Sequence, residues 1–314
     1  MKPVIIILGP TGVGKTGLSI LLAKALKTEI ISADSMLVYR HMDIGTAKPA
    51  PTELGAVPHH LINILEPDEK FSAGLFKEMA SEIIRSLHNR SKIPLIVGGT
   101  GLYIRSLTAG LFEGPGADES LRDKLLDEEK QHGKGHLYDK LKAVDPDAAG
   151  KIEANDLRRI VRALEVSLKA EKGISEIQKG ATQPLHCDYI KIGLSRDRKE
   201  LYSLIEDRVD KMMEAGLLDE TRRLLKMNPG RTAMQALGYK EMALYLDATV
   251  DLVEAVRLTK KRTKMYAKRQ HTWFRKEPDI HWIDITGILE AEKIFNKVTT
   301  DIEIIRKLIY SKVC

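Results

Sequence analysis

The fold is decided by residues 4–16, Val-Ile-Ile-Ile-Leu-Gly-Pro-Thr-Gly-Val-Gly-Lys-Thr, close to the start of this 314-residue chain. Val4 to Leu8 form an unbroken apolar run, which is typical of a buried strand in a parallel sheet. The next eight residues fit the pattern G-x-x-x-x-G-K-[ST] in full, and Gly17 to Lys27 then show helical spacing of leucines. A strand, a glycine-rich loop and a helix in this order predict a phosphate-binding loop.

Each residue type in this loop has a physical role. Glycines let backbone N–H groups turn towards phosphate oxygens, and the N-terminus of the following helix adds partial positive charge. Lys15 supplies a full charge for a terminal phosphate, and Thr16 can ligate Mg²⁺. The loop therefore predicts a bound phosphate chain but no particular reaction. Its residues are Gly9, Pro10, Thr11, Gly12, Val13, Gly14, Lys15 and Thr16.

Further strands and helices alternate along the chain. Helical spacing is found in Phe71 to Leu87 and again from Arg198 onward. This alternation predicts an α/β fold, a P-loop NTPase-like core in which a parallel sheet is flanked by helices. The further strands are expected at Glu29–Ala33, Leu61–Leu65, Pro94–Val97, Asp188–Ser195 and, at an edge, Ile280–Ile285.

The middle of the chain differs from the rest in composition and in its hydrophobic pattern. From Asp118 to about Lys179 it is charged, helical in period and without a convincing strand. We therefore expect an all-helical insertion domain at residues 116–186. The α/β core is then made of residues 1–115 and 187–314.

Composition sets the broad class of protein. The net charge of +6 and the pI near 9.0 fit a polyanionic partner without requiring one. Cys187 and Cys314 are far apart and belong to no Cys/His cluster, so we expect neither a zinc site nor a disulfide. No stretch approaches the roughly 20 apolar residues that cross a bilayer. We expect a cytoplasmic monomer that does not associate with membranes.

Polar residues follow two of the predicted strands. Ligands of open parallel sheets bind beyond the carboxyl ends of the strands, and Asp34, Ser35 and Thr100 lie at such ends. Asp34 could serve as a general base, hold metal through water, or cap the next helix, and its position alone does not choose between these. The position of Thr100 favours a simple turn residue.

Several classes of P-loop protein remain to be separated. The base-specificity motif Asn-Lys-x-Asp of GTPases is absent, and no apolar run after the loop clearly ends in Asp-x-x-Gly. A small-molecule kinase remains open, because the acceptor side of such enzymes varies.

Seven separate segments, in order along nearly the whole chain, closely resemble the tRNA dimethylallyltransferase family. They include Ile-Ser-Ala-Asp-Ser-Met-Leu-Val-Tyr at 31–39 and Val-Gly-Gly-Thr-Gly-Leu-Tyr at 97–103. The others are the phosphate loop and residues 42–49, 155–166, 236–241 and 263–274. Some members carry a C-terminal zinc finger, which this sequence lacks.

The resemblance implies a reaction and a set of site residues. The N6 amine of the adenosine immediately 3′ of the anticodon would attack dimethylallyl diphosphate, and diphosphate would leave. The phosphate loop would then hold the donor, with Mg²⁺ on Thr16 as cofactor. Asp34 would be the general base and Thr100 a hydrogen-bond partner at the reaction centre. The tRNA contacts would be Asp34, Ser35, Met36, Leu37, Arg122, Arg158, Arg159, Ile160, Val161 and Arg162.

Two basic segments allow two interpretations. In one helical segment, basic residues between 260 and 276 alternate with aromatic ones, and their charges favour a phosphate-tracking surface. The alternative is a solvated helix face, and for Trp273 and Phe274 we expect burial in the core. Read without the family, Arg158, Arg159 and Arg162 favour ion pairs with Asp156 and Glu165.

Overall fold

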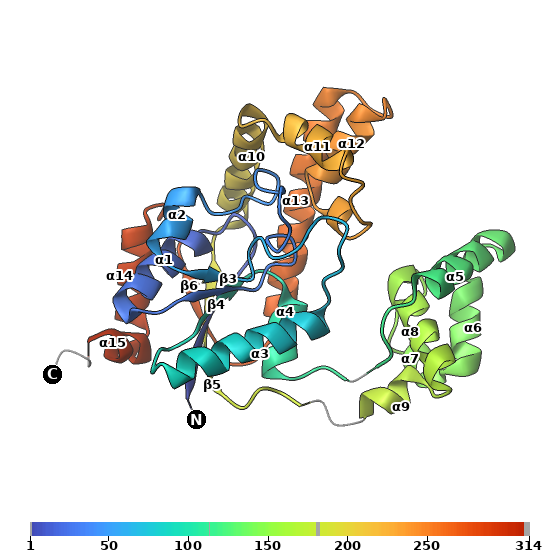
Figure 1. Cartoon of the computed structure of the whole chain (residues 1–314), viewed down its shortest axis with the longest axis horizontal. Helices are drawn as coiled ribbons and strands as arrows, with labels where there is room; N and C mark the ends of the chain where they lie inside the picture. Colours follow the sequence, from blue (N-terminus) through green and yellow to red (C-terminus); the bar gives the residue numbers. More distant parts are fainter. Residues whose placement is uncertain (1, 113, 180–182, 311–314) are drawn as a thin grey trace. The chain divides into compact units, whose positions relative to one another are not determined.

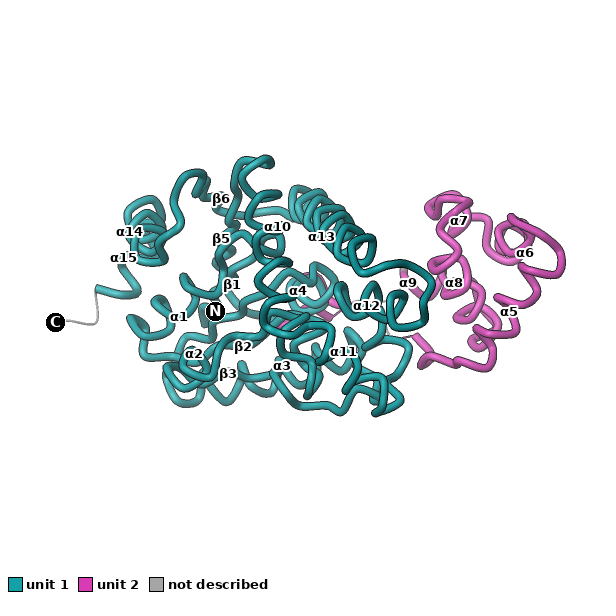
Figure 2. The backbone as a smooth tube through the Cα atoms, turned by 90° about the horizontal axis from the view of Figure 1, so that it is seen from above, with its two compact units in different colours: residues 1–108, 186–314 teal, residues 109–185 magenta. Residues whose placement is uncertain are grey.

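The computed structural model describes residues 2–112, 114–179 and 183–310, which form two compact units (Figure 2). The larger unit combines residues 1–108 with 186–314, and the smaller unit is the stretch 109–185. The insertion therefore begins at residue 109, where the sequence suggested 116, and it ends at 185 rather than 186. Cys314 lies outside the described residues, and Cys187 is a free thiol.

The larger unit is built on a six-stranded sheet in the order β3-β2-β4-β1-β5-β6. Every pairing in this sheet is parallel, which confirms the predicted α/β fold class. β1 lies near the middle, and its residues Val4 to Leu8 are fully buried. A strand covered on both faces has to be apolar throughout, as this one is. The strands are β1 Pro3–Leu8, β2 Ile30–Ser32, β3 His59–His60, β4 Leu95–Gly98, β5 Asp188–Ser195 and β6 Ile280–Asp284.

The prediction of a strand at Leu61–Leu65 is wrong. β3 stops at His60, and Leu61 and Asn63 have positive φ angles of 61° and 55°. A left-handed residue breaks the extended backbone, so the strand cannot continue. The backbone N–H groups of this segment bond to the carbonyls of Leu37 and Val38 instead, and a single bridge joins Leu65 to Tyr39. The apolar run therefore braces the loop that follows β2.

Helices cover both faces of the sheet (Figure 1). α1, α14 and α15 pack together on one face, and α3 and α4 pack together on the other. α13 contacts α4, α10 and α12 and is the longest helix of the described chain. The helices of this unit are α1 Lys15–Leu26, α2 Pro51–Ala56, α3 Ala73–Asn89, α4 Gly101–Thr108, α10 Arg198–Glu214, α11 Leu217–Leu225, the 3₁₀ helix η1 Ala233–Gln235, α12 Tyr239–Leu246, α13 Leu252–Phe274, α14 Ala291–Asp301 and α15 Glu303–Tyr310.

The smaller unit has its own apolar core and, among its described residues, no strand. α8 contributes most to this core because its apolar residues recur at helical spacing. Its N-terminus is capped by Asp156, whose side chain accepts a hydrogen bond from the N–H of Arg159 at 3.3 Å. The helices of this unit are α5 Glu119–His132, α6 His136–Val144, α7 Pro146–Ala149, α8 Leu157–Ala170 and α9 Ile174–Lys179.

The parallel sheet brings distant loops together. β2, β4 and β1 are direct neighbours, so their carboxyl ends lie side by side at one edge. The segments that leave this edge are residues 33–37 after β2, 99–100 after β4 and 9–16 after β1. Such an edge is where open parallel sheets bind ligands. Within residues 2–112, 114–179 and 183–310, no helix has the length and apolar character needed to cross a membrane.

Candidate active site

The phosphate loop joins β1 to α1 and depends on glycine at its tightest points. Gly9 has a φ of +148°, and a Cβ there would lie 2.7 Å from the carbonyl oxygen of Leu194 on β5. Gly14 is the N-cap of α1 with a φ of +111°, in the left-handed region. The helix therefore begins directly at the loop, with its unpaired N–H groups and positive dipole end at the place expected for phosphate.

Lys15 is folded back over this loop. Its ammonium donates to the carbonyl oxygens of Gly9 at 3.0 Å and Pro10 at 2.9 Å. Burial lowers the pKa of Lys15 to about 8, although the carboxylate of Asp34 works in the opposite direction and Arg208 adds to the lowering. The electrostatic influence of Asp34 shows that the residues following β1 and β2 share one site. Lys15 is a cation poised for a phosphate group that would replace its two carbonyl partners.

Arg208 is a site residue that sequence reasoning missed. It comes from α10, and its guanidinium donates to the hydroxyl of Thr11 at 3.4 Å. Burial lowers its pKa, and Asp34 opposes that effect. The available signal was its place on α10, because Arg208 follows the buried Ile205 by three residues and so lies near the buried face of the helix. Two partly buried cations, Arg208 and Lys15, thus converge on the loop.

Asp34 lies in a turn directly after β2. Its Oδ1 accepts a hydrogen bond from the backbone N–H of Met36 at 2.9 Å. No helix begins nearby, since α2 starts only at Pro51, so the interpretation of Asp34 as a helix cap is wrong. Within the described residues, its Oδ2 receives no hydrogen bond. One carboxylate oxygen is therefore fixed by the backbone, and the other is available to accept a proton.

Thr100 is more than a turn residue. Its hydroxyl oxygen accepts a hydrogen bond from the N–H of Ser35 at 3.1 Å, and its own N–H donates to the carbonyl of Ala33 at 3.2 Å. Burial raises the pKa of the Tyr266 phenol on α13, and the side chain of Thr100 acts in the opposite direction, so the two side chains lie close together. Thr100 therefore joins the loop after β4 to both sides of Asp34, and the candidate catalytic pair lies in one hydrogen-bonded unit.

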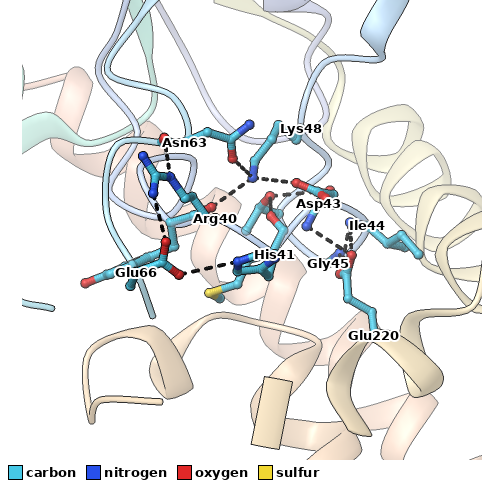
Figure 3. A network of polar contacts seen from close by, with 12 residues as sticks. Arg40, His41, Asp43, Ile44, Gly45, Lys48, Asn63, Glu66 and Glu220 are labelled. Carbon is cyan, nitrogen blue, oxygen red and sulfur yellow. Dashed lines mark hydrogen bonds and ion pairs between the residues drawn. The ribbon is translucent and has the colours of Figure 1, made fainter. Parts of the chain in front are cut away.

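The loop beyond Leu37 is held by a buried carboxylate (Figure 3). Glu220 on α11 accepts hydrogen bonds from three successive N–H groups, those of Asp43 at 3.0 Å, Ile44 at 2.9 Å and Gly45 at 3.1 Å. Lys48 closes the same loop by donating to Asp43 at 2.6 Å. Charge-assisted bonds to backbone N–H groups are strong, so this segment is fixed in shape. No sequence pattern marks Glu220, which looks like one acidic residue among many.

The predicted tRNA contacts of the smaller unit have different surroundings. Ile160 and Val161 are 1% and 6% exposed, so their side chains belong to the helical core. Arg122 and Arg162 both donate to Glu165, whose side chain is fully buried. Arg159 pairs with Asp156, as the ion-pair interpretation of this segment predicted. Arg158 is exposed and bonds to no described residue. The tRNA contacts themselves remain predictions.

The basic stretch on α13 is partly neutralised. Lys260 pairs with Asp210, Lys264 with Glu206 and Arg262 with the fully buried Glu241. For these three cations the ion-pair interpretation is therefore supported. Phe274 is fully buried, as expected. Trp273 is only half-buried and packs against Gly101, where a Cβ would lie 2.2 Å from the indole nitrogen.

The residues at the loop fit a magnesium ion that is coordinated mainly by the phosphates of a bound substrate and by water. Thr16 is exposed in the first turn of α1, and its hydroxyl bonds to no described residue. Hydroxyl oxygen is a suitable donor for Mg²⁺, which commonly completes its shell with substrate phosphates and water. Among the described side chains, no cluster of three or more His, Cys, Asp or Glu could hold a metal ion by itself.

A glycine-lined phosphate loop, two converging cations and a carboxylate at one sheet edge place the protein in the class of P-loop enzymes. The family described as IPP transferase matches residues 37–277. The chain is 53% identical to a tRNA dimethylallyltransferase from Thermodesulfovibrio yellowstonii, over 95% of this chain and 96% of that protein. It is 49% identical to one from Symbiobacterium thermophilum, over 91% and 90%. The chain belongs to the IPP transferase family, as the seven segments predicted.

Solved structures agree with this assignment. A tRNA isopentenylpyrophosphate transferase from Bacillus halodurans has a TM-score of 0.69 and 40% identity, covering 98% of this chain and 99% of that one. A eukaryotic dimethylallyltransferase, described as acting on tRNA, has a TM-score of 0.80 and 31% identity, covering 99% and 84%. These relatives do not favour the alternative of a small-molecule kinase.

Proposed function

We propose that this protein transfers a dimethylallyl group from dimethylallyl diphosphate to N6 of the adenosine immediately 3′ of the anticodon in tRNA, releasing diphosphate. The observation that carries the proposal is the position of Asp34 after β2, at the same sheet edge as the phosphate loop after β1, where its charge raises the pKa values of Lys15 and Arg208 against the larger effect of burial. It puts a carboxylate next to a diphosphate site, which is what an amine nucleophile and a diphosphate leaving group require together. The names of the relatives support the same reaction.

The donor's diphosphate binds in the loop 9–16 and draws the Lys15 ammonium away from the carbonyls of Gly9 and Pro10. Lys15 and Arg208 then neutralise the charge that develops on the leaving oxygen as the bond to C1 breaks. Stabilising a leaving group with fixed charges in a partly buried site is among the largest contributions to catalysis. The Thr16 hydroxyl would hold Mg²⁺, which would supply further positive charge to the diphosphate.

Asp34 acts on the acceptor. An aryl-type amine is a weak nucleophile, so a carboxylate that takes its proton helps the attack on C1. Oδ1 is held by the N–H of Met36, so the orientation of the carboxylate is fixed. The Thr100 hydroxyl accepts a hydrogen bond from the Ser35 N–H, and it contacts the reacting amine from the other strand end. The proton moves from N6 to Asp34 as the new C–N bond forms.

The acceptor adenine has to leave the stacked anticodon loop to reach this site. Residues 35–37 after Asp34 contact the extruded nucleotide, and the exposed Arg158 and Arg159 of α8 contact tRNA phosphates. Phosphate contacts position an RNA without reading its sequence. The protein works on tRNA in the cytoplasm and as a monomer.

The test is mass spectrometry of anticodon-loop fragments after purified tRNA has been incubated with the protein, Mg²⁺ and dimethylallyl diphosphate. We expect one added C5 unit on the adenosine 3′ of the anticodon. Asp34→Ala should nearly abolish it while tRNA still binds, and Asp68→Ala, in an exposed loop, should not. A modified base elsewhere, or ATP turnover without prenyl transfer, would contradict the proposal, and undiminished transfer by Asp34→Ala would remove Asp34 from the mechanism.

A further inference from the structure

One buried side chain connects the two halves of the site. Gln270 lies on α13 and is 6% exposed. Its Oε1 accepts a hydrogen bond from the backbone N–H of Thr11 at 2.8 Å, and its Nε2 donates to the carbonyl of Gly99 at 2.9 Å. Thr11 belongs to the phosphate loop, and Gly99 directly precedes Thr100. A single amide thus bridges the donor loop and the strand end that carries the candidate acceptor group.

The local structure is adapted to this bridge. A Cβ on Gly99 would lie 2.2 Å from Nε2, so glycine at this position leaves the room that the amide occupies. The Thr11 N–H points to Gln270, so this group of the loop is engaged by protein and not free for phosphate. Tyr266 lies one helical turn before Gln270, and the side chains of Gln270 and Thr100 are close enough to influence the pKa of its phenol, which burial raises. The same face of α13 therefore contacts the loops after β1 and β4.

We propose that Gln270 is a positioning residue that fixes the spacing between the diphosphate loop and Thr100, and so between prenyl donor and acceptor amine. The inference rests on the proposed function. The amide supplies a donor and an acceptor at this fixed separation at every pH, whereas an ionised carboxylate cannot donate and an apolar side chain can do neither. Transfer between two bound substrates is sensitive to distance, and a displacement of about 1 Å can cost about 100-fold in rate.

The test separates binding from chemistry. Gln270→Leu fills similar space but breaks both hydrogen bonds. We expect inorganic pyrophosphate and tRNA each to bind within about threefold of wild type. The single-turnover rate of prenyl transfer should fall by roughly 100-fold. Thr272→Ala is the matched control, because this exposed residue of the same helix bonds only to the carbonyl of Lys268. A folded Gln270→Leu protein with an unchanged rate would overturn the inference, as would a rate loss explained by lost pyrophosphate binding.

A second variant covers the case in which Gln270→Leu does not fold. In Gln270→Glu the acceptor for Thr11 remains, but an ionised carboxylate faces the carbonyl of Gly99. Protonation would restore a donor there, so its rate relative to wild type at the same pH should rise as the pH falls. A ratio that stays flat from pH 9 to about pH 5.5 would overturn the inference. A wild-type protein that transfers nothing would overturn the proposed function itself, which is a distinct result.

Discussion

The carboxylate of Asp34 opposes the effect of burial on the ammonium of Lys15. Burial lowers the pKa of Lys15, Asp34 raises it, Arg208 lowers it further, and the result is a pKa of about 8. Lys15 is therefore mostly charged at pH 7, although its pKa lies only about one pH unit above that value. A bound diphosphate would add negative charge beside it and raise its pKa. The loop thus holds a cation whose protonation a bound diphosphate would complete.

The affinity for inorganic pyrophosphate should fall as the pH rises through about 8. Above that pH the free protein holds neutral Lys15, and binding has to take up a proton to restore the ammonium. Calorimetry at pH 8.5 in two buffers with different ionisation enthalpies should show this uptake as a buffer-dependent heat, after correction for the titration of pyrophosphate itself. Lys15→Met should lose the uptake and most of the affinity. Lys24→Met, on an exposed face of α1, should keep both, and an equal heat in both buffers for wild type would contradict the assignment.

Arg208 should contribute to the release of diphosphate. We expect Arg208→Ala to lower the rate of transfer by about 100-fold or more, as is usual when one donor that stabilises developing charge is removed. Arg208→Lys should recover part of the rate, because it keeps the charge but loses the fork of donors that reaches Thr11. The control is Arg198→Ala, at the exposed start of the same helix. A full rate in Arg208→Ala would assign this arginine to folding alone.

The fold could be predicted because its signals are local. The apolar run 4–8, the loop 9–16 and the helix after it are adjacent in sequence, and β5 was placed at its observed bounds, Asp188–Ser195, by its alternation with helices. The parallel order of strands then follows from the chirality of the connections. The strand ends that carry Asp34 and Thr100 were predictable for the same reason. The prediction that failed was the strand at Leu61–Leu65, where an apolar run forms a loop that hydrogen-bonds to the segment after β2.

The rest of the site depends on contacts between residues that are far apart in sequence. Gln270 lies 259 residues from Thr11, and Glu220 lies 177 residues from Asp43. On their helices both look like ordinary polar residues, and only the folded chain reveals which groups they meet. Ile160 illustrates the opposite case, since a resemblance marked it as an RNA contact, whereas the structure buries its side chain in the core of the smaller unit. Local sequence patterns therefore predict the position of the candidate active site in the fold. They do not predict which distant side chains complete that site.

Glu29 should stabilise the fold at the edge of β2. Burial raises its pKa, but hydrogen bonds from Arg90, Lys92 and His60 outweigh this and lower the pKa to about 2. A carboxylate with a lowered pKa contributes stability above its unfolded value of 4.5 and loses it as the pH falls towards 2. Glu29→Gln should lower the free energy of unfolding by about 3 kcal/mol at pH 7.

The difference in the free energy of unfolding between wild type and Glu29→Gln should shrink to about half at pH 3. Urea unfolding of wild type and Glu29→Gln at both pH values checks the prediction, with the exposed Glu78→Gln as control. A difference that does not depend on pH would mean that Glu29 acts by shape and not by charge.

Arg158 tests whether the smaller unit binds tRNA through free cations. Arg122 and Arg162 share the buried Glu165, Arg159 pairs with Asp156, and Lys169 pairs with Asp118. Arg158 is exposed and bonds to no described residue, so it carries an uncompensated charge into solvent. Arg158→Ala should weaken tRNA binding and reduce the slope of log affinity against log salt by about 1, because one phosphate contact releases about one counterion. Lys130→Ala, an exposed cation of α5 paired with Asp127, should leave that slope unchanged. If the two variants gave the same slope as wild type, α8 would not contact phosphates through Arg158.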